Sequence, residues 1–123
     1  MKTSPLGSSD LQVTPVTLGT MTFGKEADEN TSRALLDQYV EAGGNLIDTA
    51  DVYSKGLSEE IIGRWLHDSG KRDDVFIATK ARFAMEKGGP RGLHPDYLRG
   101  AIEANLRRLG IDTIDLFQPH TFD

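Results

Sequence analysis

The chain alternates short apolar runs with longer stretches in which apolar residues recur every three or four positions. The short runs lie at residues 16–20, 45–49, 75–80 and 114–118. Runs of this length predict β-strands, and the periodic stretches between them predict three amphipathic helices. The predicted strands begin 29, 30 and 39 residues apart, and this spacing favours right-handed βαβ units on a parallel sheet.

Two of the predicted helices have clear start and stop signals. Asp28 is expected to cap the first helix, which ends at Gly43 and Gly44. Pro95 suits the first position of the third helix, which continues to Gly110. The apolar faces are expected at Leu35, Leu36, Tyr39 and Val40 in the first helix and at Leu98, Ala101, Ile102, Leu106 and Leu109 in the third.

The second predicted helix follows a short polar loop. Ser58 is expected to cap it, and Glu59 and Glu60 are expected to favour its N-terminal end through the helix dipole. The turn-favouring residues at 68–70 end it. Its buried stripe is expected at Ile61, Ile62, Trp65 and Leu66.

Residues 2–13 alternate weakly around a turn-favouring cluster at 7–10, which predicts a β-hairpin. We therefore expect one α/β domain over residues 1–123, with the hairpin in 1–15 and four strands and three helices in 16–123. The alternation leaves two architectures open, a doubly wound sheet and part of a (β/α)8 barrel. The glycine-rich stretch 81–93 is expected to be a long loop, and loops of that length are often functional.

Composition and charge exclude several classes of protein. The 123 residues are 37% hydrophobic and 27% charged, with a net charge of -5 that disfavours non-specific nucleic-acid binding. No apolar run approaches the roughly 18 residues of a membrane span, and no signal peptide is evident, so we expect a cytoplasmic protein that contacts neither membrane nor nucleic acid. We expect no metal site, because the chain has no cysteine and His67, His94 and His120 lack the spacing of metal ligands.

Four polar residues follow the predicted strands at one edge of the sheet. Asp48 and Tyr53 follow the second strand, Lys80 ends the third, and His120 follows the fourth. The carboxyl ends of parallel strands are where α/β proteins build their active sites, so these side chains can converge. Taken singly, each has an ordinary alternative, respectively a turn cap, packing on a loop, a solvated strand end and a hydrogen-bonded histidine.

Together the four groups suit the protonation of an oxygen that acquires negative charge. A tyrosine hydroxyl, with an ordinary pKa of about 10, donates a proton poorly at neutral pH unless a nearby cation stabilises the phenolate. A lysine can supply that cation, an aspartate can orient the lysine, and a neutral histidine can position the substrate oxygen. None of these groups supplies hydride, so reduction of a carbonyl would need a nicotinamide cofactor.

Five segments resemble the N-terminal half of an aldo-keto reductase, in the order in which that family has them. They read PLGSSDLQV, TLGTMTFG, NLIDTADVY, VFIATK and LRRLGIDTIDLFQPH. The resemblance covers essentially the whole chain. It implies the first four strands of a (β/α)8 barrel and the NADP(H)-dependent reduction of aldehydes or ketones.

The resemblance also implies roles for individual residues. Tyr53 would be the general acid, Lys80 and Asp48 would tune its acidity, and His120 would orient the substrate. The nicotinamide end of the cofactor would contact Gly19, Thr20, Met21 and Asp48, and the substrate would contact Phe23, Tyr53 and His120. Phe23 has the alternative of ordinary core packing.

The chain departs from the family in two ways. Phe117 stands in the fourth strand where many relatives have tyrosine. A whole barrel needs about 250 residues, so strands five to eight, which hold most of the cofactor's pyrophosphate and adenosine in that family, would have to come from elsewhere. We therefore expect a fragment of a longer enzyme, a self-associating half-barrel or one chain of a two-chain enzyme. The alternative is a non-catalytic protein that acts through subunit assembly or binding.

Overall fold

A computed structural model describes residues 1–122 of the chain. The strands are β1 (Ser4–Pro5), β2 (Gln12–Val13), β3 (Leu18–Gly19), β4 (Leu46–Asp48), β5 (Phe76–Ala81) and β6 (Leu116–Pro119). The helices are α1 (Glu29–Glu41), α2 (Leu57–Ser69) and α3 (Pro95–Leu109), with short 3₁₀ turns at η1 (Tyr53–Gly56) and η2 (Arg72–Asp74). The element order is the one that the apolar pattern predicts.

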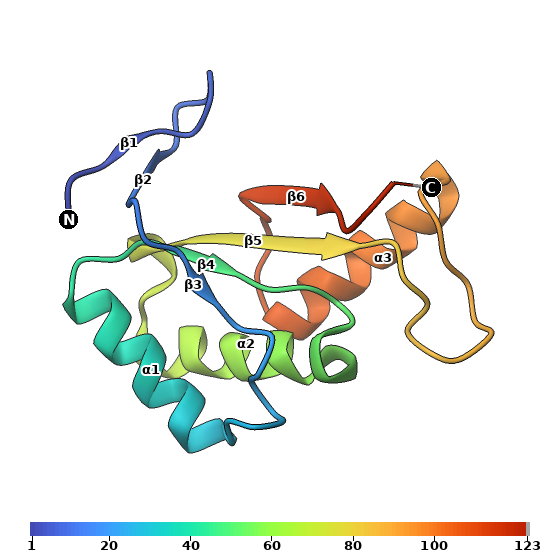
Figure 1. Ribbon diagram of the computed structural model, residues 1–123, viewed down its shortest axis with the longest axis horizontal. Helices are drawn as coiled ribbons and strands as arrows, with labels where there is room; N and C mark the ends of the chain where they lie inside the picture. Colours follow the sequence, from blue (N-terminus) through green and yellow to red (C-terminus); the bar gives the residue numbers. More distant parts are fainter. Residues whose placement is uncertain (123) are drawn as a thin grey trace.

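The four later strands form one parallel sheet in the order β3-β4-β5-β6. All three helices cover the same face of this sheet. In Figure 1, α1 and α2 lie below the sheet and α3 passes behind β5. A doubly wound sheet carries helices on both faces, whereas a barrel carries them outside only. The structure therefore favours the half-barrel of the two architectures that the sequence left open.

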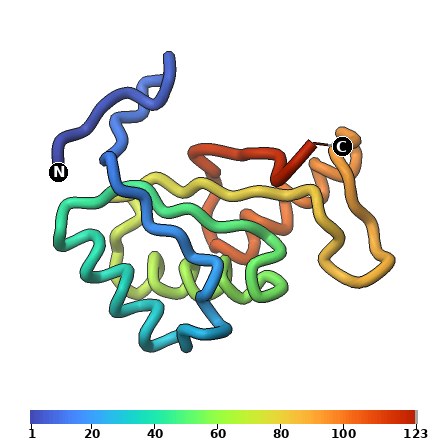
Figure 2. Tube along the Cα trace, viewed as in Figure 1, coloured from blue at the N-terminus to red at the C-terminus, as the bar shows by residue number. Residues whose placement is uncertain are grey.

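The N-terminal hairpin lies on the opposite side of the sheet from the helices, at the amino ends of the strands (Figure 2). β1 and β2 pair antiparallel, with Ser4 opposite Val13, which confirms the predicted hairpin. Its apolar residues pack with inward-facing sheet residues in a small cluster of Leu6, Leu11, Val13, Leu46, Phe76, Ala78 and Leu116. The hairpin thus covers the inner face of the sheet at the amino ends of the strands. The inner face at the carboxyl ends stays open.

The main core lies between the sheet and the helices. Ile47 and Ile77 point outward from β4 and β5 and are fully buried. The predicted stripe of α2 packs on them, with Ile61, Ile62, Trp65 and Leu66 all buried. Successive side chains of each strand thus point to opposite faces of the sheet. The outer face is apolar and packs on the helices, and the inner face can hold functional side chains.

The helix signals held in α1 and α3, whereas in α2 the predicted stop at 68–70 held and the predicted start did not. Asp28 accepts a hydrogen bond from the Thr31 backbone N–H at 2.8 Å, as a cap should, and Pro95 opens α3. In α2 the prediction of a Ser58 cap is wrong, because the helix begins at Leu57 after Gly56, which has a φ of 93°. Ser58 is instead fully buried inside the first turn.

The first strand of the sheet is shorter than the apolar run 16–20 predicts. Val16 is 58% exposed, and the ladder with β4 contains only Leu18 and Gly19 of β3. Among residues 1–122, no helix is long and apolar enough to cross a membrane.

Candidate active site

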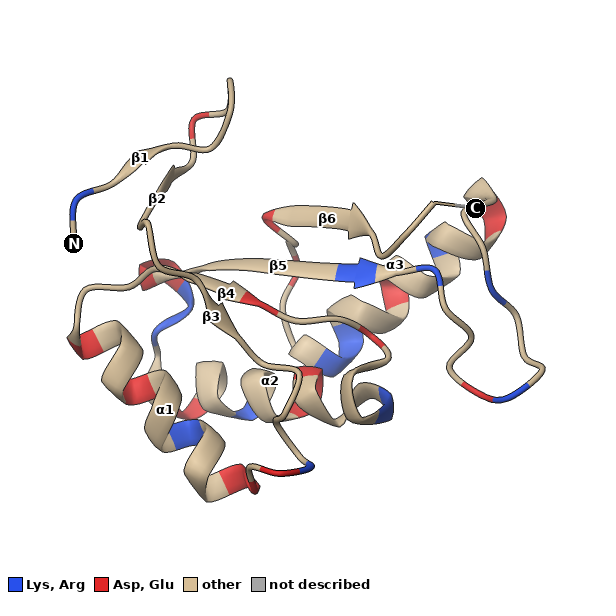
Figure 3. Ribbon diagram, viewed as in Figure 1, with Lys and Arg blue, Asp and Glu red and all other residues tan. Residues whose placement is uncertain are grey.

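Lys80 and Asp48 form an ion pair at the carboxyl end of the sheet. The ammonium Nζ of Lys80 donates to both carboxylate oxygens of Asp48, at 2.9 and 2.8 Å, and to the backbone oxygen of Thr49 at 2.8 Å. The side chains are 14% and 29% exposed respectively. Figure 3 shows the basic end of β5 beside the acidic end of β4. Both residues face the inner side of the sheet, because Asp48 pairs with Ala78 in register and Lys80 lies two positions further along β5.

Tyr53 lies at the start of the turn that follows β4. Its hydroxyl is 3.4 Å from Lys80 Nζ, and the same ammonium lies 5.0 Å from the centre of its ring. Ser54 and Lys55 adopt left-handed backbone conformations, with φ of 51° and 52°. Ser54 Oγ donates to the Phe23 backbone oxygen at 2.6 Å, which ties this turn to the loop after β3. Residues other than glycine adopt that conformation at a cost in free energy, and such strain is concentrated at functional sites.

His120 follows β6 and closes the group of four. Its backbone N–H donates to the Ala81 oxygen at 3.1 Å, and its ring meets the Tyr53 ring edge-on with centres 5.7 Å apart. Phe83, from the loop after β5, also packs against the His120 ring, with the two ring centres 4.9 Å apart. Burial, and next the positive charge of Lys80, lower the pKa of His120 below 6.5, while Asp48 opposes the shift. The imidazole is therefore neutral at pH 7.

A hydrogen-bonding position on this histidine is open. Among residues 1–122, His120 Nδ1 is buried and has no hydrogen-bond partner. A buried polar atom without a partner is uncommon in folded proteins and is a feature of sites that receive a ligand. The structure thus brings together all four side chains that the sequence placed at this edge.

Beside the four residues, the inner face of the sheet is hollowed. A cavity of about 490 Å³ has a lining of Leu6, Thr17, Gly19, Leu46, Asp48, Ala78, Lys80, Leu116 and Gln118. Gly19 is paired with Asp48 across β3 and β4, and a Cβ built on it would meet no atom within 4 Å. A flat ring can therefore lie over Gly19 beside the ion pair.

The other residues expected at the cofactor or the substrate differ in accessibility. Met21 is 65% exposed in the loop after β3, whereas Thr20 is fully buried. Thr20 Oγ1 donates to the Asp48 backbone oxygen at 2.9 Å, so it supports the site from behind. Phe23 is only 1% exposed and belongs to the main core. Its position therefore favours ordinary core packing over a contact with substrate.

A buried cluster of hydroxyls behind the ion pair escaped the sequence analysis. Ser58 Oγ donates to Thr20 Oγ1 at 2.9 Å and lies 3.0 Å from Thr49 Oγ1. The three residues are fully buried and come from three separate elements of the chain. They anchor the strand ends that carry Asp48 and the Thr49 carbonyl bound by Lys80. In the sequence, the one indication of this cluster was that small polar residues stand at the ends of predicted buried strands.

A second buried network surrounds Glu59, which lies in the first turn of α2 as expected. Glu59 is 0% exposed and accepts hydrogen bonds from Thr79 Oγ1, Asn105 Nδ2 and Arg108 Nε, each at 2.7 Å. The sequence predicted its place in the helix but gave no sign of this burial or of these three hydrogen bonds. Arg108, in the last turn of α3, is the charged partner that makes this burial possible.

Comparison with known proteins identifies this arrangement. Residues 15–123 match the sequence profile of the family described as the aldo/keto reductase family. The chain belongs to the aldo/keto reductase family. The resemblance noted in the sequence motifs is thereby confirmed, and with it the assignment of the four strands to part of an aldo/keto reductase barrel.

Individual relatives of this aldo/keto reductase chain match nearly all of it. Norsolorinic acid reductase stcV of Emericella nidulans is 39% identical over 134 residues, which cover 98% of this chain and 34% of that protein. An aldo-keto reductase of Schizosaccharomyces pombe, named yakc [NADP(+)], is 39% identical over 101 residues, or 78% of this chain and 29% of the relative. The chain therefore spans about a third of the length of these curated relatives.

A solved structure shows the same fold. The holo form of an aldo-keto reductase from Bacillus halodurans superposes with a TM-score of 0.84 and 39% identity. The match covers 97% of this chain and 40% of that one.

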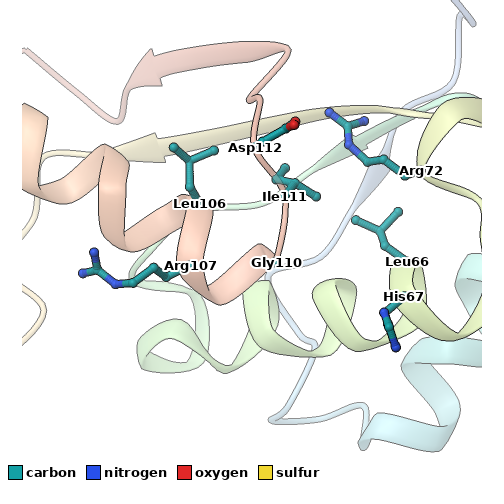
Figure 4. Close-up of a pocket in the computed structure, with 8 residues that line it drawn as sticks. All are labelled: Leu66, His67, Arg72, Leu106, Arg107, Gly110, Ile111 and Asp112. Atoms are coloured by element: carbon teal, nitrogen blue, oxygen red, sulfur yellow. The ribbon is translucent and has the colours of Figure 1, made fainter.

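A separate groove of about 550 Å³ lies between the C-terminal ends of α2 and α3 (Figure 4). Its lining consists of Leu66, His67, Arg72, Leu106, Arg107, Gly110, Ile111 and Asp112. None of the four residues at the carboxyl edge takes part in it, so we assign it no role in the chemistry.

Proposed function

We propose that this chain supplies the proton-donating half of an NADP(H)-dependent reductase of aldehydes or ketones. The observation that carries the proposal is the position of Lys80 Nζ, which contacts both the Asp48 carboxylate and the Tyr53 hydroxyl. Membership of the aldo/keto reductase family supports it, as does the name of the relative from Schizosaccharomyces pombe, which includes NADP(+).

In this proposal Tyr53 is the general acid. Its hydroxyl delivers a proton to the carbonyl oxygen of the substrate as negative charge develops there. The ammonium of Lys80 stabilises the phenolate that remains, and Asp48 holds that ammonium in place by accepting two of its hydrogen bonds. Neutral His120 donates a hydrogen bond to the same oxygen and fixes its orientation.

The residues of this chain fit the nicotinamide end of the cofactor. The inner-face cavity offers an unobstructed surface at Gly19 beside the ion pair, and the exposed side chain of Met21 follows it in the chain. When bound there, the nicotinamide supplies the hydride that this chain's side chains cannot. The contacts of the pyrophosphate and adenosine portions are assigned to the remainder of the barrel.

We further propose that catalysis needs a completed barrel. β3 and β6 are the edge strands of the described sheet, and the carboxyl half of its inner face is open. Exposed edges and an uncovered inner face favour pairing with further strands. Those strands would come from a longer chain, from a second copy of this chain or from a separate chain that carries the complementary half-barrel.

The competing function is a non-catalytic subunit that acts through assembly, and the same open edges favour it. It gives no physical reason for a half-buried lysine–aspartate pair in contact with a tyrosine, because that pair makes a poor packing surface. Titration with NADPH, monitored by cofactor fluorescence, separates the two functions. The reductase proposal expects saturable binding once a complementary half-barrel is present, and no binding in either form would rule it out.

A further inference from the structure

A second cavity lies outside the barrel, under the loop that joins β5 to α3. It has a volume of about 400 Å³. Its lining consists of Asp51, Met85, Glu86, Pro90, Asp96, Tyr97, Gly100, Ala101, Ala104 and Arg108. It shares no residue with the inner-face cavity that contains Asp48 and Lys80, so the proposed reduction does not account for it.

Asp51 is a buried carboxylate at this cavity. The residue is 1% exposed, and within residues 1–122 its Oδ1 has no hydrogen-bond partner. The backbone fixes its position, because its N–H donates to the Lys80 carbonyl oxygen at 3.1 Å. A buried carboxylate oxygen that lacks a donor is costly, and the cost is removed by a ligand that brings the donor.

The cation that lines this cavity is already engaged by another acid. Arg108 lines the same cavity, but its Nε donates to Glu59 Oε1 at 2.7 Å, and Glu59 is fully buried. One guanidinium thus faces two buried carboxylates, Glu59 and Asp51. The rim adds Glu86 and Asp96, of which Asp96 is paired with Arg99 at 3.2 Å. The charge balance around Asp51 is therefore negative.

The remaining walls of the cavity are apolar. Met85 and Pro90 come from the loop, and Ala101 and Ala104 come from α3. Tyr97 adds its ring and is held in place by a hydrogen bond from its hydroxyl to the Phe83 backbone oxygen at 3.3 Å. A cavity with apolar walls and a few placed charged groups is the usual form of a small-molecule site.

We propose that this cavity binds a small organic cation, in which a primary ammonium or amidinium group pairs with Asp51 and a compact apolar body packs between the loop and α3. The ammonium donates to the free Oδ1 and neutralises the uncompensated charge. The apolar body contacts Met85 and Tyr97. A neutral or anionic molecule of the same shape gains the packing but not the ion pair.

The cation site should depend on pH. Burial, and next the negative charge of Glu59, raise the pKa of Asp51 from 3.8 to about 6, while backbone hydrogen bonding from Val52 and then the charge of Arg108 oppose the shift. Asp51 is therefore mostly protonated at pH 5 and mostly ionised at pH 7. Affinity for an ammonium ligand should rise by about tenfold over that interval, because only the ionised form attracts it.

The test uses benzylamine as the probe and benzyl alcohol as its neutral control. Binding to the 123-residue chain is followed by amide chemical shifts in NMR at pH 7. We expect benzylamine to shift the signals of Asp51 and Tyr97 saturably, and Asp51→Asn to weaken its binding at least about tenfold, the worth of one charge-assisted hydrogen bond. Binding of benzyl alcohol should be weak and should be the same in both proteins.

A second variant tests the cavity without touching the carboxylate. A Cβ on Gly100 would meet no atom within 4 Å, and Gly100 lines the cavity from a helix. Gly100→Leu should therefore fill the space and abolish benzylamine binding, whereas Gly100→Ala should fold at least as well as the parent chain and retain binding. Absence of saturable binding, equal affinity for benzylamine and benzyl alcohol, or unchanged affinity in Asp51→Asn would overturn the proposal.

Discussion

Lys80 donates hydrogen bonds to both carboxylate oxygens of Asp48, at 2.9 and 2.8 Å, across neighbouring parallel strands. The register that pairs Asp48 with Ala78 puts the lysine two residues beyond, on the same face of the sheet. A third bond to the Thr49 backbone oxygen at 2.8 Å fixes the ammonium. The position of the charge next to Tyr53 is thus set by the strands and does not depend on a flexible loop.

Removal of one partner should expose the strength of this pair. Asp48→Asn removes the charge and leaves Lys80 with an uncompensated ammonium, so we expect the free energy of unfolding to fall by roughly 1 to 3 kcal/mol, the range for a hydrogen bond to a charged group. Urea unfolding measures the change. The matched control, Asp10→Asn, alters an exposed aspartate in the hairpin turn and should change stability little. Equal stability of the two variants would contradict the structural role of the pair.

The pKa of His120 should reflect its burial and the nearby charge of Lys80. Because its pKa in the folded chain lies below 6.5, the unfolded chain binds the proton more tightly. This residue therefore reduces stability as the pH falls below about 6.5. NMR titration of the ring protons should give a midpoint below 6.5, and Lys80→Met should move the midpoint upward because a neighbouring positive charge is lost. A midpoint at or above 6.5 in the parent chain would contradict the burial and the proximity of Lys80.

The hydroxyl cluster behind the ion pair should matter for stability. Ser58→Ala removes the shared partner of Thr20 and Thr49. We expect a loss of roughly 1 to 3 kcal/mol, because the buried Thr49 hydroxyl then loses its hydrogen bond to Ser58. Ser8→Ala, at an exposed position of the hairpin turn, is the control and should lie within about 0.5 kcal/mol of the parent. A loss no larger than that in Ser58→Ala would show that the cluster is dispensable.

Neighbouring glutamates in α2 provide a matched pair. Glu59 is fully buried against Arg108, whereas Glu60 is exposed. Glu59→Gln should destabilise the chain by roughly 3 kcal/mol, since it leaves the Arg108 cation without its charge partner. Glu60→Gln should have little effect in the same thermal or urea unfolding measurement. Similar losses in both would mean that the helix dipole, and not the buried pair, accounts for the contribution of Glu59.

Sequence reasoning recovered the features whose cause is local. The cap at Asp28 and the helix start at Pro95 depend on residues within one turn, and the buried stripe of α2 follows from helical period alone. The convergence of Asp48 and Lys80 was also predictable, because parallel strands bring their carboxyl ends to one edge. Family resemblance added the roles proposed for these residues, which pattern alone does not provide.

The features that escaped the sequence depend on distant partners. Ser58 looked like a cap because it precedes two acidic residues, but the cap position is taken by the left-handed Gly56, two residues earlier. The burial of Glu59 gave no local signal because its partner Arg108 lies 49 residues later in the chain. Asp51 gave no signal, since its burial depends on α3 and on the loop after β5.

The central claim is that Tyr53 donates the proton in carbonyl reduction. The most direct measurement joins residues 1–123 to the remaining barrel of the Bacillus halodurans relative, whose structure superposes with a TM-score of 0.84. In this chimera we compare the parent with Tyr53→Phe for kcat with an aromatic aldehyde and for the NADPH dissociation constant. The account predicts a loss of kcat of at least about 100-fold, the lower end for general acid catalysis, with NADPH affinity nearly unchanged. A Tyr53→Phe chimera that reduces the aldehyde at the parent rate, or that loses NADPH binding to the same extent as activity, would contradict it.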